Sequence, residues 1–182
     1  MRTLILLCFV FIYNLNFSQS KYITRTGTVA FEASVPSFEE VKAKNETTTC
    51  IINTDTGNIA ALVFVKAFRF KNALMEEHFN ENYIESNTYP KMTFKGSIDN
   101  FNVLLLSEKN SNISITGDLT LHGKTSKVSI DEAKMSMQNN IISISGSFNV
   151  KPSDFDIKIP KVVSKKISNR IDIIFEFKLE KQ

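Results

Sequence analysis

The sequence has no Trp, two Cys, two His, four Pro and six Gly among its 182 residues. The two histidines, His78 and His122, are far apart in the chain, and no paired His or Cys spacing of a zinc site is present. No Gly-rich phosphate loop and no Gly-x-Ser-x-Gly nucleophile motif occurs. Glu76 and Glu77 are adjacent on an expected helix, so their side chains point apart. We therefore expect a protein that is not an enzyme, with no catalytic residues, no metal and no cofactor.

The net charge of +3 is small. Nucleic-acid-binding proteins usually present a concentrated basic face. Lys165 and Lys166 are the only adjacent basic pair, and Asp172 follows soon after. We interpret this pair as part of a solvated turn, and we expect no nucleic-acid partner.

The first 18 residues have the order of a secretory signal peptide. Arg2 precedes an apolar run over residues 4–13, and small and polar residues follow. That run is shorter than the roughly 20 apolar residues of a membrane span. We expect cleavage between residues 18 and 20, a periplasmic or secreted protein, and no transmembrane span in the mature chain. A buried first strand is the alternative. After cleavage Cys50 is the sole cysteine, so no intramolecular disulfide forms, and we expect a buried, inert thiol.

The mature chain alternates apolar and polar residues with a period of two, the pattern of β-strands. We expect eight or nine strands within one domain over residues 21–182. They lie in the segments 28–35, 47–53, 58–68, 91–95, 101–106, 113–121, 128–130, 142–150 and 171–179. The sequence predicts a tight turn at 122–124 and a bulge at Gly117-Asp118. A helix is expected over 72–86 with Asn72 as its cap, and a looser helix or turn near 153–155.

Several of these strands are too apolar to leave an open sheet edge. The pattern therefore predicts an all-β fold with one or two short helices, whose strands either close into a barrel or stack as a sandwich. An eight-stranded barrel has an interior that side chains fill or that holds one small ligand. The chain contains 15 Phe, a residue that suits either a packed core or an apolar cavity wall. Periodicity alone leaves both alternatives open.

Two segments resemble the YceI-like family of lipid- or polyisoprenoid-binding proteins. The first runs from His78-Phe79 through Tyr83-Ile84-Glu85-Ser86 to Tyr89-Pro90-Lys91-Met92-Thr93-Phe94, and the second is Gly117-Asp-Leu-Thr-Leu-His-Gly-Lys-Thr125. The resemblance covers about residues 22–179 and implies an eight-stranded antiparallel, lipocalin-like β-barrel with an elongated apolar channel. Two family features are absent: a His-containing segment before the first strand, replaced here by residues 22–27, and an Arg-Asp pair before the helix His, replaced by residues 75–77.

Our first hypothesis is therefore an exported protein that binds an isoprenoid or other elongated lipid. Its apolar channel is expected to consist of Val29, Phe31, Leu62, Phe64, Phe68, Phe70, Met92, Phe94, Leu106, Leu121, Phe148, Phe175 and Phe177. The candidate contacts for a polar head group are Lys66, Arg69, His78, Tyr89 and Lys91. The second hypothesis is a filled barrel that acts as a protein-interaction or structural module. The third is an enzyme acting on a lipid in the cavity through Cys50, His78 or His122. A monomer and a homodimer both remain open.

Overall fold

The computed structural model describes residues 20–36 and 38–182. The predicted signal peptide therefore lies outside the described residues. The described residues form nine strands: β1 (Lys21–Ser34), β2 (Lys42–Asn53), β3 (Asn58–Phe64), β4 (Arg69–Phe70), β5 (Lys91–Ile98), β6 (Ser111–Leu121), β7 (Lys124–Gln138), β8 (Ile141–Val150) and β9 (Ile167–Lys181). One α-helix, α1 (Ala73–His78), continues into the π-helical turn η2 (Phe79–Tyr83). The short 3₁₀ turns are η1 (Val65–Ala67), η3 (Val103–Leu105) and η4 (Pro152–Phe155).

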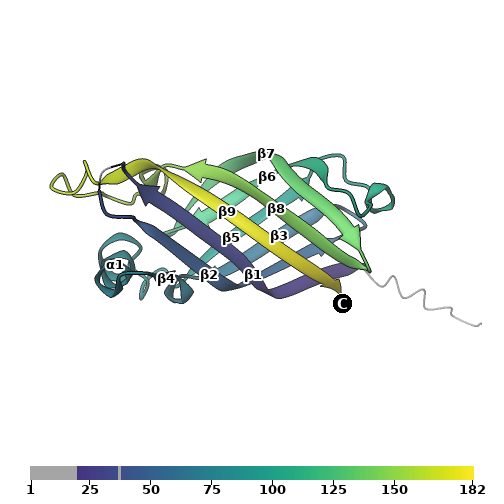
Figure 1. The fold of residues 1–182 in the computed structure, drawn as a ribbon, viewed down its shortest axis with the longest axis horizontal. Coiled ribbons are helices and arrows are strands. Elements are labelled where there is room, and N and C mark those ends of the chain that lie inside the picture. Colours follow the sequence, from purple (N-terminus) through teal and green to yellow (C-terminus); the bar gives the residue numbers. More distant parts are fainter. Residues whose placement is uncertain (1–19, 37) are drawn as a thin grey trace, which may run out of the picture.

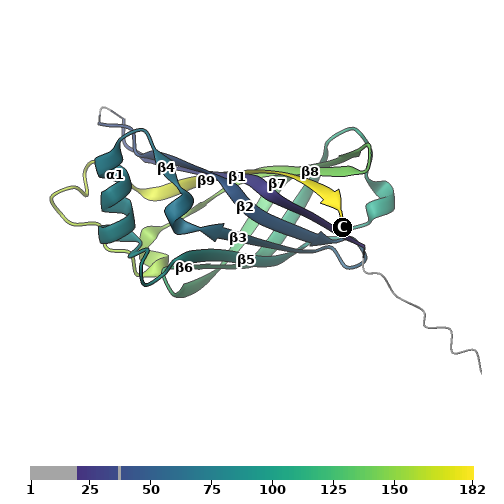
Figure 2. The same cartoon turned by 90° about the horizontal axis from the view of Figure 1, so that it is seen from below.

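The strands form a closed antiparallel barrel (Figures 1 and 2). The hydrogen-bonded order is β1-β9-β8-β7-β6-β5-β3-β2, and pairing of β1 with β2 closes the ring. The two residues of β4 pair only with β2, beyond the end of β3. The predicted eight-stranded antiparallel barrel is thus confirmed.

A buried amide lies where the pairing partners of β2 change. Asn45 is fully buried between the segment of β2 that pairs with β4 and the segment that pairs with β3. Its Nδ2 donates to the Phe64 carbonyl oxygen at 3.0 Å, and its Oδ1 accepts from the Thr47 amide at 2.8 Å. The Thr47 and Thr48 hydroxyls donate to the same Oδ1. The side chain therefore replaces ladder hydrogen bonds where the register of β1 and β2 shifts.

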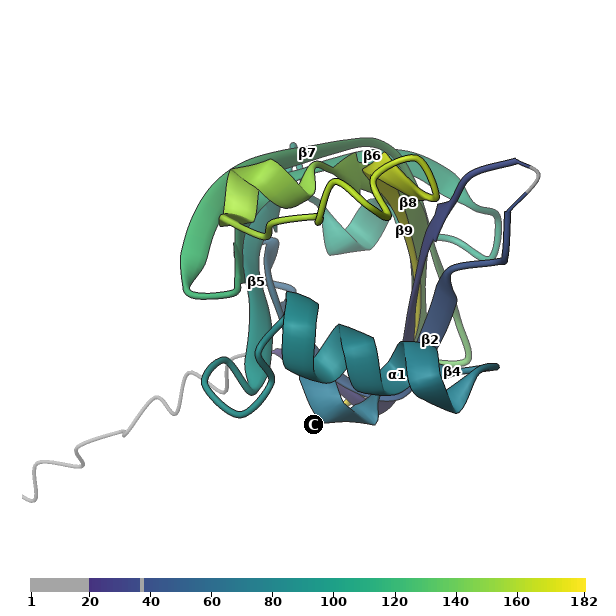
Figure 3. The ribbon, with the colours of Figure 1, turned by 90° about the vertical axis from the view of Figure 1, so that its left-hand side faces the viewer.

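The two ends of the barrel differ. At the end that holds the C-terminus, buried side chains fill the interior: Tyr22, Cys50, Ile52, Ile98, Met135, Ile142, Ile144 and Leu179. We call this the filled end. The opposite end carries α1, the β1–β2 loop, η4 and the loop 157–166, and we call it the open end (Figure 3). The side-chain filling thus belongs to the end with the C-terminus, and the helix and the long loops gather at the opposite end.

Several local predictions are confirmed. The Asn72 side chain accepts hydrogen bonds from the amides of Leu74 and Met75, which caps α1. His122 and Gly123 both have positive φ, 51° and 73°, as the two-residue β6–β7 hairpin requires. The looser turn expected near 153–155 is η4.

Three local predictions are wrong. The run 101–106 is not a strand but contains η3, whose Leu104 and Leu105 are largely exposed. The strand expected over 58–68 ends at Phe64. No bulge occurs at Gly117-Asp118, since Gly117 pairs in continuous register with Gly96 of β5. A Cβ on Gly117 would lie 2.6 Å from Cζ of Phe94, so this glycine makes room for the ring.

Candidate functional site: an apolar cavity at the open end

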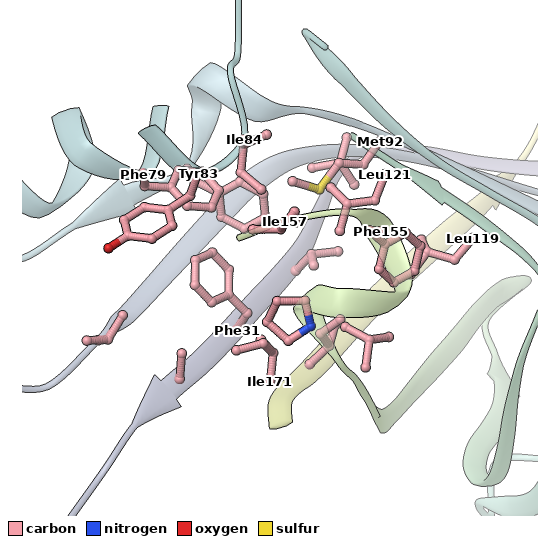
Figure 4. A pocket seen from close by; sticks show the side chains of 18 of the residues that line it. Phe31, Phe79, Tyr83, Ile84, Met92, Leu119, Leu121, Phe155, Ile157 and Ile171 are labelled. Carbon is pink, nitrogen blue, oxygen red and sulfur yellow. The ribbon is translucent and has the colours of Figure 1, made fainter. Parts of the chain in front are cut away.

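A cavity of about 420 Å³ extends from the middle of the barrel to the open end. Its deep part is bordered by Ile59, Ile115, Ile130 and Phe177, next to the filled end. Figure 4 shows side chains from opposite walls pointing into one space, among them Phe31 of β1, Leu121 of β6 and Ile171 of β9. The lining is almost entirely aliphatic and aromatic, so the cavity suits an apolar molecule.

Four phenylalanines form an aromatic cluster beneath α1. The Phe31 ring lies 5.2 Å from that of Phe79, 5.3 Å from Phe68 and 5.7 Å from Phe70, measured between ring centroids. Phe79 also contacts Phe68 and Phe70 at 5.8 and 5.2 Å. These edge-to-face and stacked pairs fix the helix on the barrel. One wall of the cavity therefore consists of packed aromatic rings.

The loop between η4 and β9 forms the opposite wall. Phe155 of η4 is fully buried, and Ile157, Ile159 and Val163 of the loop line the cavity. Asp156 has a positive φ of 56° and pairs with Lys124 of the β6–β7 hairpin at 2.8 Å. This ion pair lowers the pKa of Asp156 and raises that of Lys124. The loop is thus tied to the hairpin where it leaves η4.

Most of the predicted channel residues line this cavity. They are Val29, Phe31, Phe68, Phe70, Met92, Phe94, Leu121, Phe148, Phe175 and Phe177. Leu62 and Phe64 do not, because Ile59, Ala61 and Val63 are the residues of β3 that face inward. Both faces of β3 are apolar, so the sequence alone did not show which of its residues face the interior. Leu106 packs against the filled-end core, because the chain at 101–106 crosses the filled end.

Of the predicted head-group contacts, only His78 lines the cavity. Arg69 instead bonds the carbonyls of Lys66 and Phe68 and the Glu76 carboxylate. The same carboxylate accepts from the Phe70 amide at 3.1 Å, which holds α1 against β4.

The other three candidates also have partners away from the cavity. Lys66 donates to Asn87 at 2.6 Å, and the Lys91 ammonium lies 5.6 Å from the outward-facing Phe64 ring. Tyr89 packs edge-on against His122, with centroids 4.6 Å apart. All three stabilise local structure around the barrel rim.

Two charged residues that sequence reasoning did not select border the cavity mouth. They are Glu39 of the β1–β2 loop and Lys166, both exposed. The Glu39 carboxylate accepts a hydrogen bond from the Asn72 side chain at 2.9 Å. In the sequence, the Lys165-Lys166 pair was the available sign of positive charge in this segment. Only the path of the loop shows that Lys166 reaches the mouth. Lys166, His78 and Glu39 are thus polar side chains within an otherwise largely apolar lining.

The thiol and the second histidine lie apart from the cavity. Burial raises the pKa of Cys50, in the filled end, to about 12, so the thiol stays protonated. His122 is turned toward the carbonyl of Phe155. Among residues 20–36 and 38–182, no group of three or more His, Cys, Asp or Glu is arranged to hold a metal ion. Over the same ranges, no helix has the length and apolar character needed to cross a membrane.

The model of the YceI-like domain family matches residues 14–179. The chain belongs to the YceI-like family. This confirms the resemblance found in the sequence. No curated protein matches the chain.

Solved structures share the fold of this YceI-like chain at low sequence identity. A polyisoprenoid-binding domain from Saccharophagus degradans, implicated in plant cell wall breakdown, aligns with a TM-score of 0.77 and 14% identity, covering 89% of this chain and 98% of its own. BcnA of Burkholderia cenocepacia aligns at 0.69 and 16%, covering 84% and 95%. The YceI protein of Campylobacter jejuni aligns at 0.61 and 15%, covering 81% and 88%. At this identity the likeness concerns the fold.

Proposed function

We propose that this protein is an exported, non-enzymatic carrier that holds one elongated apolar molecule, such as an isoprenoid chain, in the open-end cavity. The observation that carries the proposal is the apolar lining of a preformed 420 Å³ space. Protein sites for small molecules commonly have volumes of about 300–1,000 Å³ and mostly apolar walls. One structural neighbour is described as polyisoprenoid-binding, which supports the same ligand class.

The energetics favour a chain-like ligand. Each buried methylene contributes about 0.8 kcal/mol, so a long hydrocarbon binds without many polar contacts. The polar group of the ligand lies at the mouth, near Lys166 and His78. The apolar chain points toward Ile115 and Phe177, where the filled-end core begins.

The cavity favours this function over a filled-core interaction module. A barrel filled along its whole length would leave no space for a guest. Catalysis at Cys50 is disfavoured because the thiol is buried outside the cavity and its pKa is raised. His122 also lies outside the cavity lining, which leaves His78 at the mouth as the remaining candidate base.

Export is part of the proposal. It is supported by the charge and hydropathy order of residues 1–18, which precede a barrel domain over residues 21–182. The protein would then act in the periplasm or outside the cell. Amino-terminal sequencing of the protein isolated from its own host tests this, and a retained Met1 would refute it.

The test of the carrier function is native mass spectrometry of the protein purified from its host, followed by solvent extraction and mass analysis of lipids. A stoichiometric apolar molecule is expected. Empty protein is then challenged with prenyl alcohols, quinones and fatty acids. A protein that arrives empty and takes up none of them refutes the proposal and supports the filled-core module.

A matched pair of variants tests the location. Ala61 faces the cavity, whereas its neighbour Ala60 is absent from the lining. Ala61→Phe should occupy part of the space and lower uptake at least tenfold, while Ala60→Phe should leave uptake unchanged. Equal uptake by the two variants, with both folded by circular dichroism, would exclude this cavity as the site.

A further inference from the structure

The loop 157–166 has two chemically distinct faces. Ile157, Ile159 and Val163 line the cavity and are half-buried. The residues between and after them are exposed, including Lys158, Lys161, Val162 and Lys165. Val162 is 85% exposed.

The loop also concentrates charge. Its ten residues contain four lysines, Lys158, Lys161, Lys165 and Lys166, and no acidic residue, whereas the entire chain has a net charge of only +3. None of the ion pairs between described residues involves these lysines, although Lys158 lies close enough to Asp156 to contribute, after Lys124, to the lowered pKa of that carboxyl. By contrast, Lys71 across the mouth is paired with Glu40 at 2.6 Å. The positive charge on the loop is therefore available to an external partner.

Other exposed apolar side chains occur on the same end of the barrel. Leu74 of α1 is 57% exposed, and Phe38 of the β1–β2 loop is 47% exposed while also lining the cavity. Figure 3 shows α1 and the 157–166 loop on opposite sides of the barrel end. Exposed apolar residues and the Glu39 carboxylate thus border the mouth, with the loop lysines on one side.

We propose that the loop 157–166 docks the open end onto an anionic phospholipid bilayer. Lysines near such a surface are attracted by its negative potential, and exposed apolar side chains enter the boundary between head groups and acyl chains. Docking in this orientation places the cavity mouth against the bilayer. An apolar ligand then passes between membrane and protein without crossing water. This last consequence rests on the proposed carrier function, but the docking itself does not.

The test is co-sedimentation with vesicles of phosphatidylglycerol and phosphatidylcholine, compared with pure phosphatidylcholine. We expect binding to the anionic vesicles that weakens at high salt. The triple variant Lys158→Gln, Lys161→Gln, Lys165→Gln should lose about a hundredfold in affinity, because each basic residue near the surface contributes about a factor of five. Val162→Ser should lose about threefold to tenfold in affinity, because the variant no longer buries the apolar Val162 side chain in the bilayer.

The matched control replaces three exposed wall lysines, Lys127, Lys134 and Lys178, by Gln. It removes the same net charge and should lose less than threefold. Equal losses in the two triple variants would mean that only net charge matters and would overturn the docking surface. The proposal would also be overturned if the unmodified protein did not sediment with the anionic vesicles. That result would be expected if the loop bound an acidic polypeptide instead of a bilayer.

A second measurement separates this proposal from the carrier function. Uptake of a prenyl alcohol in the absence of vesicles should be unchanged in the loop triple variant, because Lys166 and the cavity-facing side chains are retained. Normal uptake without vesicle binding refutes docking alone. Vesicle binding without any uptake refutes the carrier function alone.

Discussion

Nδ1 of His122 lies 2.9 Å from the carbonyl oxygen of Phe155, which joins the β6–β7 hairpin to η4. A carbonyl only accepts, so Nδ1 carries the hydrogen and donates it. Nε2 is buried, has no hydrogen-bond partner among residues 20–36 and 38–182, and lies 3.8 Å from the Glu85 carboxylate. Tyr89 covers the ring from the side. One imidazole therefore connects three segments at the open end: the hairpin, the 85–89 turn and η4.

Replacement of His122 should loosen this end. His122→Asn tolerates the positive φ of the turn but removes the ring, leaving the Phe155 carbonyl without its donor. We expect a loss of about 1–3 kcal/mol in the free energy of unfolding, the usual cost of an unsatisfied buried group. Chemical denaturation measures it. His78→Asn, at an exposed site, is the control, and equal stability of both variants would contradict the structural role.

The two ends of the barrel should respond differently to the same truncation. Ile142 is fully buried in the filled end, so Ile142→Ala should cost about 2–5 kcal/mol. Ile171 is half-buried and borders the cavity, so Ile171→Ala enlarges an existing space and should cost less. Thermal denaturation gives the difference. Similar costs at both sites would indicate that the open end is as tightly packed as the filled end.

Cys50 should be inert in the folded protein. In a Cys8→Ser chain it is the only thiol, and a maleimide or disulfide reagent should label it only after denaturation. Labelling of the native protein at neutral pH as fast as that of the unfolded chain would contradict the burial.

The raised pKa of Cys50 also has a consequence for stability. The unfolded thiol ionises near its ordinary value of 9.0, whereas the folded thiol stays protonated up to about 12. The unfolded state therefore loses this proton first, and the contribution of Cys50 to stability falls as the pH rises from about 9 to about 12. In Cys50→Ala, this part of the decrease in the free energy of unfolding at alkaline pH should be absent. Chemical denaturation at several pH values measures it.

Asn45 should be among the residues that tolerate substitution least. Its amide side chain makes four hydrogen bonds in a fully buried position. Asn45→Ala leaves the Phe64 carbonyl and the Thr47 amide without these partners, so we expect a loss of about 2–4 kcal/mol. Asn112→Ala, on an exposed position of β6, is the control for urea denaturation. Comparable midpoints for the two variants would show that β2 does not need this network.

The local chemistry of the chain determined much of the fold. Alternating apolar residues such as those of β8 and β9 define inner and outer faces, because successive side chains of a strand point to opposite sides. Asn72 defines the start of α1, and His122-Gly123 defines a two-residue hairpin, since each depends on residues adjacent in sequence. The second of the two family motifs, residues 117–125, contains this hairpin.

Tertiary structure decided what periodicity left ambiguous. The inward phase of β3 depends on its pairing with β2 and β5, so Ala61 and not Leu62 faces the cavity. Whether the interior is filled or hollow depends on side chains from strands distant in sequence meeting at one level of the barrel. The path of the chain around the open end brings Lys166 to the mouth. It also places Arg69 beside Glu76, with which Arg69 forms an ion pair. Contacts between residues far apart in the chain set these outcomes, and no local pattern encodes them.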